Sequence, residues 1–274
     1  MNTALRIASV LLPLLYLLVT VGYGFLFFAK RPAARKVAPP LFYATLALHL
    51  LYMVALTVRW HQFPMASVSQ ALSAVAFAVA LVYAFVEWHG REASTGFLML
   101  LAATFLETLS ALLRTPSPPD REIFHNPLFA THTGSALLGY TAFMVAATYG
   151  FLFLRLYHEI KRRRFSVFFG QLPPLEVLER MMLGAMVAGF VALTGTVISG
   201  AIWARQEFQV PWLRDPKMLL TFAIWLFYGV TLLLQRLRRL QGRQLALAAL
   251  AGVVAILFSL LAVNLFLTQV HDFI

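Results

Sequence analysis

Long apolar stretches, each about the length of a membrane span, alternate with short polar connections along the whole chain. A helix needs about 20 mostly apolar residues to cross the hydrocarbon core of a bilayer. By this criterion the sequence predicts eight spans, which are Leu5–Phe28, Pro40–Val58, Met65–Glu87, Gly96–Leu113, Leu128–Leu154, Met181–Ala204, Met218–Leu234 and Leu245–Thr268. Because the connections are short, we expect one all-α, polytopic membrane domain over residues 1–274 and no separate soluble domain.

The composition supports this pattern and excludes other classes of protein. Of the 274 residues, 61% are hydrophobic and 12% are charged, against about 45–50% and about 25% in soluble domains. A soluble globule of this size cannot bury so much apolar surface, and a disordered chain would be far less hydrophobic. The chain has no cysteine, which excludes disulfides, thiolate metal sites and covalent attachment of haem to the chain itself.

The distribution of basic residues predicts the orientation of the chain. Connections that follow the first, third, fifth and seventh spans carry 15 of the 22 Lys and Arg residues, and the other side carries 7. Since cytoplasmic loops are enriched in Lys and Arg, both termini are predicted to face outward. The net charge of +11 is therefore read as a topology signal, and no nucleic-acid partner is expected. The first apolar run is too long for a cleaved signal peptide.

The longest predicted cytoplasmic connection runs from Arg155 to Arg180. It combines a basic run with nearby phenylalanines, which is typical of an orienting loop with anchors at the lipid surface. Pro173 and Pro174 followed by Glu176 predict the start of a helix that continues into the sixth span.

Two histidines lie at the same predicted outer level. His132 is about one turn into the fifth span, and His271 directly follows the eighth. Neutral imidazole is a common ligand of haem iron, so two imidazoles from different helices could bind one iron from opposite faces. The alternative is that both are interfacial histidines without a function.

The outer connection between the sixth and seventh spans is short, aromatic and mixed in charge. Its tryptophans fit either an interfacial aromatic belt or stacking on a flat apolar macrocycle. Its basic residues could pair with the carboxylates of such a ligand, and Asp215 would cap the seventh span. These residues are Trp203, Arg205, Trp212, Arg214, Asp215 and Lys217.

Two ionisable residues fall well inside predicted spans, where their burial is costly. His49 is in the middle of the second span and is interpreted as a buried ligand, a proton-relay residue or a hydrogen-bonded packing residue. Glu107 is in the fourth span, seven residues before Arg114 on the same helical face. It could form an ion pair with Arg114, receive a proton or face a cofactor.

These motifs resemble those of the cytochrome c assembly (CcsA/ResC/CcmC-like) membrane proteins, and especially their HemX/YpjD-like branch. In that family an external tryptophan-rich segment precedes Trp-Asp-Pro-Lys-Glu and a span with Thr-Trp-Leu. The segments at 203–217 and 223–228 follow that order. The segment at 61–70, which includes His61 and Phe63-Pro64, and the segment at 172–180 are similar to further family motifs. The resemblance implies that His132 and His271, which flank the tryptophan-rich segment, are axial haem ligands.

The chain also departs from the family pattern. Arg214 stands where the family has a tryptophan, and Met218 follows the lysine where the family has glutamate. A further transmembrane histidine is replaced by the stretch Leu232–Gln235, and the chain contains no large periplasmic domain. The resemblance therefore implies haem binding and leaves haem-lyase activity open. We expect at most one part of a lyase system rather than a stand-alone enzyme.

The implied function is non-covalent, b-type haem handling in a bacterial inner membrane. Haem would lie in an outward-facing cleft of spans five to eight, near Trp203 and Trp212, for attachment to apocytochrome c, with or without a partner membrane subunit. One alternative is a HemX-type membrane regulator of a tetrapyrrole-synthesis enzyme. Another is a small-solute transporter, against which the few polar residues inside the spans argue.

Overall fold

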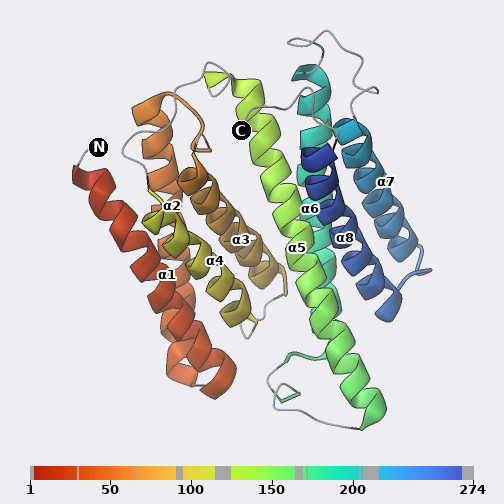
Figure 1. The fold of residues 1–274 in the computed structure, drawn as a ribbon. Coiled ribbons are helices and arrows are strands. Elements are labelled where there is room, and N and C mark those ends of the chain that lie inside the picture. The colour runs from red at the N-terminus through yellow and green to blue at the C-terminus, as the bar shows by residue number, and fades with distance from the viewer. Residues whose placement is uncertain are drawn as a thin grey trace.

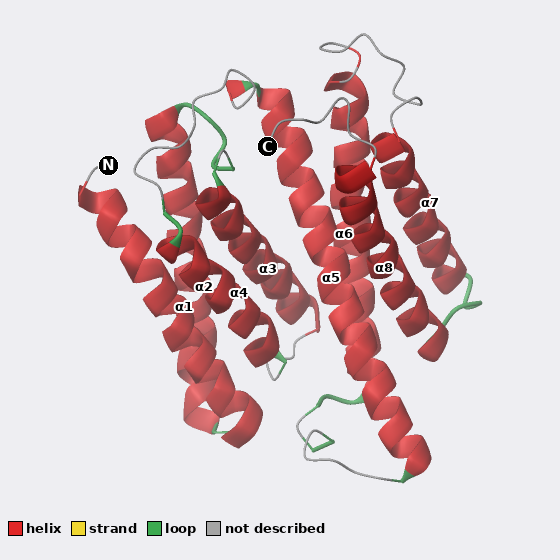
Figure 2. Ribbon diagram, in the orientation of Figure 1, coloured by secondary structure: helices red, strands yellow, loops and turns green. Residues whose placement is uncertain are grey.

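Eight α-helices follow one another along the chain, and their order agrees with the predicted spans. The computed structural model describes residues 3–29, 31–65, 67–90, 95–114, 125–163, 169–170, 172–203, 205 and 216–266. The helices are α1 (Thr3–Ala29), α2 (Pro32–Trp60), α3 (Val68–Gly90), α4 (Gly96–Leu112), α5 (Pro127–Arg162), α6 (Leu175–Trp203), α7 (Pro216–Arg236) and α8 (Arg243–Phe266). Figure 2 shows only helices and loops among the described residues.

The helices have the length and polarity of a membrane bundle. Within the described part of the chain, six helices are long and apolar enough to cross a bilayer, and Gly96–Leu112 and Arg243–Ser259 are apolar but shorter. Large apolar side chains such as Leu14, Val191 and Val254 are 57%, 66% and 65% exposed. Polar side chains such as His49 and Glu107 are fully buried. Apolar side chains on the outer surface, with these polar side chains kept in the interior, confirm the predicted polytopic membrane fold.

The helices form two groups of four that lie side by side (Figure 1). In the first group α1 packs against α2 and α4, and α3 packs against α4 and α2. In the second group α5 packs closely on α6 and also on α8, while α7 packs on α6 and α8. Helix α3 joins the groups, because it contacts both α5 and α6.

Two predicted spans are longer as helices than the hydropathy indicated. Helix α2 begins at Pro32 rather than Pro40, because a proline is well suited to the first turn of a helix. Helix α5 continues to Arg162 rather than Leu154, and its polar last turns contain an Arg155–Glu159 ion pair of 3.3 Å. Hydropathy detects only the part of a helix that lies in hydrocarbon, so helical turns in the interfacial layer were missed.

The segment before the sixth span folds as predicted. Helix α6 begins at Leu175, directly after the two prolines. Its residue Glu179 accepts a hydrogen bond of 2.9 Å from the backbone N–H of Gly242, which has a φ of +52° in the turn before α8. One carboxylate thus connects the start of α6 to the α7–α8 turn.

Candidate functional site

His132 lies near the start of α5 and its imidazole is directed toward α6. The helix is started by Pro127 and by Asn126, whose side chain accepts a hydrogen bond of 2.8 Å from the N–H of Leu128. The Nδ1 atom of His132 lies 3.1 Å from the carbonyl oxygen of Thr196 on α6. A carbonyl oxygen can only accept, so Nδ1 carries the hydrogen and donates it. In the neutral imidazole this leaves the lone pair on Nε2.

An aromatic group surrounds this histidine at the end of α6. The ring centroid of Trp203 is 5.8 Å from that of His132, with 46° between the ring planes. Trp203 also meets Phe129 edge to face at 5.8 Å, and it is only 5% exposed. The structure therefore brings together His132 and Trp203, two residues that the sequence assigned to one site.

Gly200 makes room for the imidazole between the two helices. A Cβ atom at this position would lie 2.8 Å from Cε1 and 2.9 Å from Nδ1 of His132. These distances are shorter than ordinary contacts between non-bonded carbon atoms, about 3.5–4.0 Å. Any side chain larger than hydrogen at position 200 would have to displace the imidazole from its hydrogen bond to Thr196.

Sequence reasoning selected Trp203 but missed Thr196 and Gly200, the two other α6 residues that position His132. Thr196, Gly200 and Trp203 are spaced at i, i+4 and i+7, which places them on one face of a helix. That spacing is visible in the sequence. It does not reveal that this face is directed at α5, nor that the partner is a backbone carbonyl.

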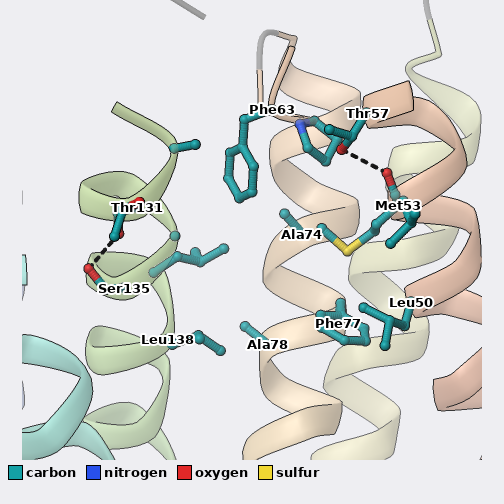
Figure 3. Close-up of a pocket in the computed structure, with 15 residues that line it drawn as sticks. Leu50, Met53, Thr57, Phe63, Ala74, Phe77, Ala78, Thr131, Ser135 and Leu138 are labelled. Carbon is teal, nitrogen blue, oxygen red and sulfur yellow. Dashed lines mark hydrogen bonds between the residues drawn. The ribbon is translucent and has the colours of Figure 1, made fainter. Parts of the chain in front are cut away.

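A cavity of about 330 Å³ lies on another face of α5, between α2, α3 and α5 (Figure 3). The hydroxyl groups on its wall donate hydrogen bonds within their own helices. Thr57 donates to the Met53 carbonyl at 3.0 Å, and Ser135 donates to the Thr131 carbonyl at 2.7 Å. The wall is therefore mostly apolar, which suits a hydrocarbon chain. This cavity is separate from the cleft that the sequence predicted among spans five to eight.

The buried His49 is held by protein groups on both ring nitrogens. Its Nδ1 lies 3.0 Å from the hydroxyl of Tyr16, and its Nε2 lies 3.0 Å from the hydroxyl of Ser73. A metal would have to displace one of these partners. The structure therefore favours a hydrogen-bonding role over the buried-ligand interpretation.

The carboxylate of Glu107 accepts a hydrogen bond of 2.8 Å from Ser73. The guanidinium of Arg114, which the sequence offered as a partner for Glu107, instead donates to the hydroxyl and carbonyl oxygens of Ser9.

Comparison with known proteins connects these features to a family. The family model described as cytochrome C assembly protein matches residues 17–271. The chain belongs to the cytochrome c assembly protein family. The matched range includes His132, Trp203 and His271, and it covers all eight helices at least in part.

Several relatives in the family carry the name cytochrome c biogenesis protein CcsA. The one from Prochlorococcus marinus strain MIT 9312 is 24% identical over 258 residues, which cover 84% of this chain and 82% of that protein. The one from P. marinus strain MIT 9515 is 37% identical over 98 residues, 36% of this chain and 31% of that protein. The one from Synechococcus sp. strain CC9605 is 34% identical over 103 residues, 38% of this chain and 34% of that protein. The latter two matches thus cover about a third of each relative.

The remaining predicted site residues of this family member are described only in part. Arg205 is exposed and lies two residues after the end of α6. Outside the described residues are Trp212, Arg214, Asp215 and His271, together with the side chain of Lys217. The pairing of His132 with His271 therefore stays a prediction.

A further histidine on the predicted outer side, His61, forms a hydrogen bond through its backbone carbonyl group. It ends α2 with a φ of +52°, and its carbonyl oxygen lies 2.6 Å from Nδ1 of His125. This bond connects the end of α2 to the segment just before α5. Both side chains are exposed, so we interpret the contact as structural.

Proposed function

We propose that this chain is a membrane haem-binding protein of cytochrome c assembly. It would hold haem non-covalently at the outer end of the second helix group and present it for attachment to apocytochrome c. Membership in the family supports a role in cytochrome c assembly. The residues around His132 support the more specific role in haem binding.

The hydrogen bond from His132 to Thr196 is the observation that carries this proposal. Histidines that bind metals almost always donate their second ring N–H to a carbonyl, a carboxylate or water, which sets the tautomer and the ring orientation. Here Nδ1 is engaged in this way, so Nε2 has the lone pair that haem iron requires. The donor chemistry of His132 therefore fits an axial ligand.

The surroundings of His132 also fit a flat, largely apolar ligand. Trp203 and Phe129 supply aromatic surface beside the imidazole. His271 would be the second axial ligand and Trp212 a second stacking surface. The cationic side chains of Arg205, Arg214 and Lys217 would pair with the haem propionates, and Asp215 would cap the start of α7.

In this role the chain would position haem but would not supply a thiol for the thioether bonds between haem and apocytochrome c. The chain has no cysteine, so the thiols of the thioether bonds would come from apocytochrome c. We further propose a bacterial inner-membrane location, with the site on the outer face and with apocytochrome c or a partner membrane subunit beside it. The orientation rests on the basic residues of the connections, which are concentrated on the opposite side.

Absorption spectroscopy of the purified protein tests the proposal. The chain is expressed with excess haem, purified in detergent and measured in its oxidised and reduced forms. We expect a haem Soret band in the unaltered chain and its loss in both His132→Ala and His271→Ala.

His158→Ala is the matched control for these variants. His158 lies on the same helix as His132, and its Nδ1 also bonds to a carbonyl, that of Leu154 at 2.7 Å. It lies at the opposite end of α5, so this variant should keep the Soret band. A chain that purifies without haem, or equal loss of haem in all three variants, would contradict the proposed site.

A further inference from the structure

The centre of the first helix group contains a continuous chain of four hydrogen-bonded side chains. Tyr16 comes from α1, His49 from α2, Ser73 from α3 and Glu107 from α4, so each helix contributes one residue. The three contacts measure 3.0, 3.0 and 2.8 Å in this order. All four side chains are buried, and three of them are fully inaccessible.

The chain of contacts has two hydrogen arrangements that differ by one proton. In the first, Tyr16 donates to Nδ1 of His49, Nε2–H donates to Ser73, and Ser73 donates to an ionised Glu107. In the second, Glu107 is protonated and donates to Ser73, Ser73 donates to Nε2, and Nδ1–H donates to Tyr16. Hydroxyl groups both donate and accept, so every heavy-atom contact is preserved in both arrangements. When a proton binds Nδ1 of His49, the Nε2 proton can pass to Ser73 and the Ser73 proton to Glu107. The net result is a protonated Glu107.

Among the residues that the structure describes, no Lys or Arg side chain lies within ion-pair distance of Glu107, so a negative charge there would not be permanently compensated. Its Oε2 is 3.8 Å from Nε2 of His49, while Arg114 donates to Ser9. Its Oε1 is buried and accepts no hydrogen bond from any group in the described part of the chain. A buried, uncompensated carboxylate is costly, and uptake of a proton removes that charge. Among the described residues, the titratable groups that face this carboxyl are Tyr16 on α1, His49 and Tyr52 on α2, and Arg114 just after the end of α4.

Further hydrogen-bonded polar pairs lie on both sides of this relay, toward the two ends of the helix group. On the predicted outer side, Ser69 and Ser110 each donate to the carbonyl oxygen of the other, at 2.9 and 2.7 Å. The contact between Arg114 and Ser9 follows beyond them.

On the predicted cytoplasmic side, Thr20 and Thr104 contact each other at 2.7 Å, and Tyr23 donates to Glu87 at 2.8 Å. From Ser9 to Tyr23 the rise along α1 is about 21 Å at 1.5 Å per residue. These polar groups thus extend through most of a hydrocarbon core of about 30 Å.

We propose that these polar side chains, from Arg114 and Ser9 at one end to Tyr23 and Glu87 at the other, form a column between α1–α4 that acts as a proton path. Glu107 would be its proton-exchanging carboxyl group. Its ligand is the proton alone, and no oxidant or reductant is needed. Ionisable residues inside membrane spans commonly mark proton relays. The path is separate from the proposed haem site on α5 and α6, so the test of one proposal does not depend on the outcome of the other.

Proton flux into proteoliposomes tests this proposal. The full chain is reconstituted with a pH-sensitive dye inside the vesicles, and a potassium gradient with valinomycin sets the membrane potential. Glu107→Gln keeps the size of the side chain and its ability to accept from Ser73, but it cannot exchange a proton. We expect this variant to reduce the flux by about 100-fold, the lower end of what a positioned proton-transfer group contributes.

Glu159→Gln is the control, because Glu159 is a carboxylate at the end of α5, paired with Arg155. Its flux should equal that of the unaltered chain. Flux through the unaltered chain that does not exceed that of Glu107→Gln, or of empty vesicles, overturns the proposal.

Infrared difference spectroscopy between high and low pH gives a second measurement that does not depend on transport. A carbonyl band of a buried carboxylic acid should appear on acidification, disappear in Glu107→Gln and remain in Glu159→Gln. Ser73→Ala should keep this band and still lose the flux, because it interrupts the relay without removing the carboxyl group. A band that is unchanged in Glu107→Gln overturns the assignment of the carboxyl group.

Discussion

Replacing Gly200 by alanine is expected to weaken haem binding although no candidate ligand is altered. The new methyl carbon would lie 2.8 Å from Cε1 of His132, so relief of the overlap requires a shift of about 0.7–1.2 Å. The same shift would lengthen the 3.1 Å hydrogen bond to Thr196 beyond the range of a normal bond. The imidazole would then lose the partner that sets its orientation.

The size of the effect follows from the role of that partner. Loss of an outer-shell hydrogen bond to a metal-binding histidine typically lowers metal affinity by about 10–100-fold. We therefore expect the haem Kd of Gly200→Ala to rise by about 10–100-fold, or about 1.4–2.7 kcal/mol. Titration of the haem-free protein, followed by absorbance at the Soret band, measures this Kd directly.

Gly195→Ala provides a matched control on the same helix. Its methyl carbon would lie 3.6 Å from the Cβ of Ser135, which is an ordinary contact, so haem affinity should not change. Both variants should retain their thermal unfolding temperature to within a few degrees. If Gly200→Ala binds haem as tightly as the unaltered chain, the bond from His132 to Thr196 does not position an iron ligand.

Two further predictions concern the stability of the bundle. Glu179→Ala removes the acceptor for the N–H of Gly242 and should lower the free energy of unfolding by about 1–3 kcal/mol, whereas Glu176→Ala, at an exposed position of the same helix, should have little effect. Phe143→Ala removes a fully buried ring stacked on Tyr228 at 3.6 Å and should cost about 3–5 kcal/mol. Loss of helical circular dichroism with rising SDS content in mixed micelles measures both, and equal effects of the two glutamate variants or a neutral Phe143→Ala would contradict these assignments.

The number and order of the helices were predictable from the sequence because each span must satisfy its own backbone in lipid. That constraint acts locally, so a hydropathy pattern is enough to detect it. It says less about where a helix ends, since polar turns in the interfacial layer satisfy their backbone equally well. This is why the pattern detected neither the first two turns of α2 nor the last two of α5.

Only those residues of the candidate site whose side-chain type points to a particular chemistry could be predicted from the sequence. His132 and Trp203 could be selected because imidazole and indole at one depth suggest haem. The Thr196 carbonyl could not, because every residue has a carbonyl and only the rotation of α6 against α5 selects this one. The polar content of the spans was underestimated for a related reason. Single hydroxyl groups, such as that of Ser73, attract attention only when packing brings them together.

The hydrogen-bond partners of His132 and His49 indicate why the roles of these two histidines should differ. His132 bonds through Nδ1 to a carbonyl oxygen, which can only accept, so one tautomer is imposed and Nε2 keeps its lone pair. His49 bonds to the hydroxyl groups of Tyr16 and Ser73, which both donate and accept, so either tautomer is satisfied. A fixed tautomer suits a ligand that must present one atom to iron, and an exchangeable tautomer suits a group that passes protons. Replacing Ser73 by alanine should therefore leave haem binding unchanged and stop proton transfer. Gly200→Ala, which displaces His132, should weaken haem binding and leave proton transfer unchanged.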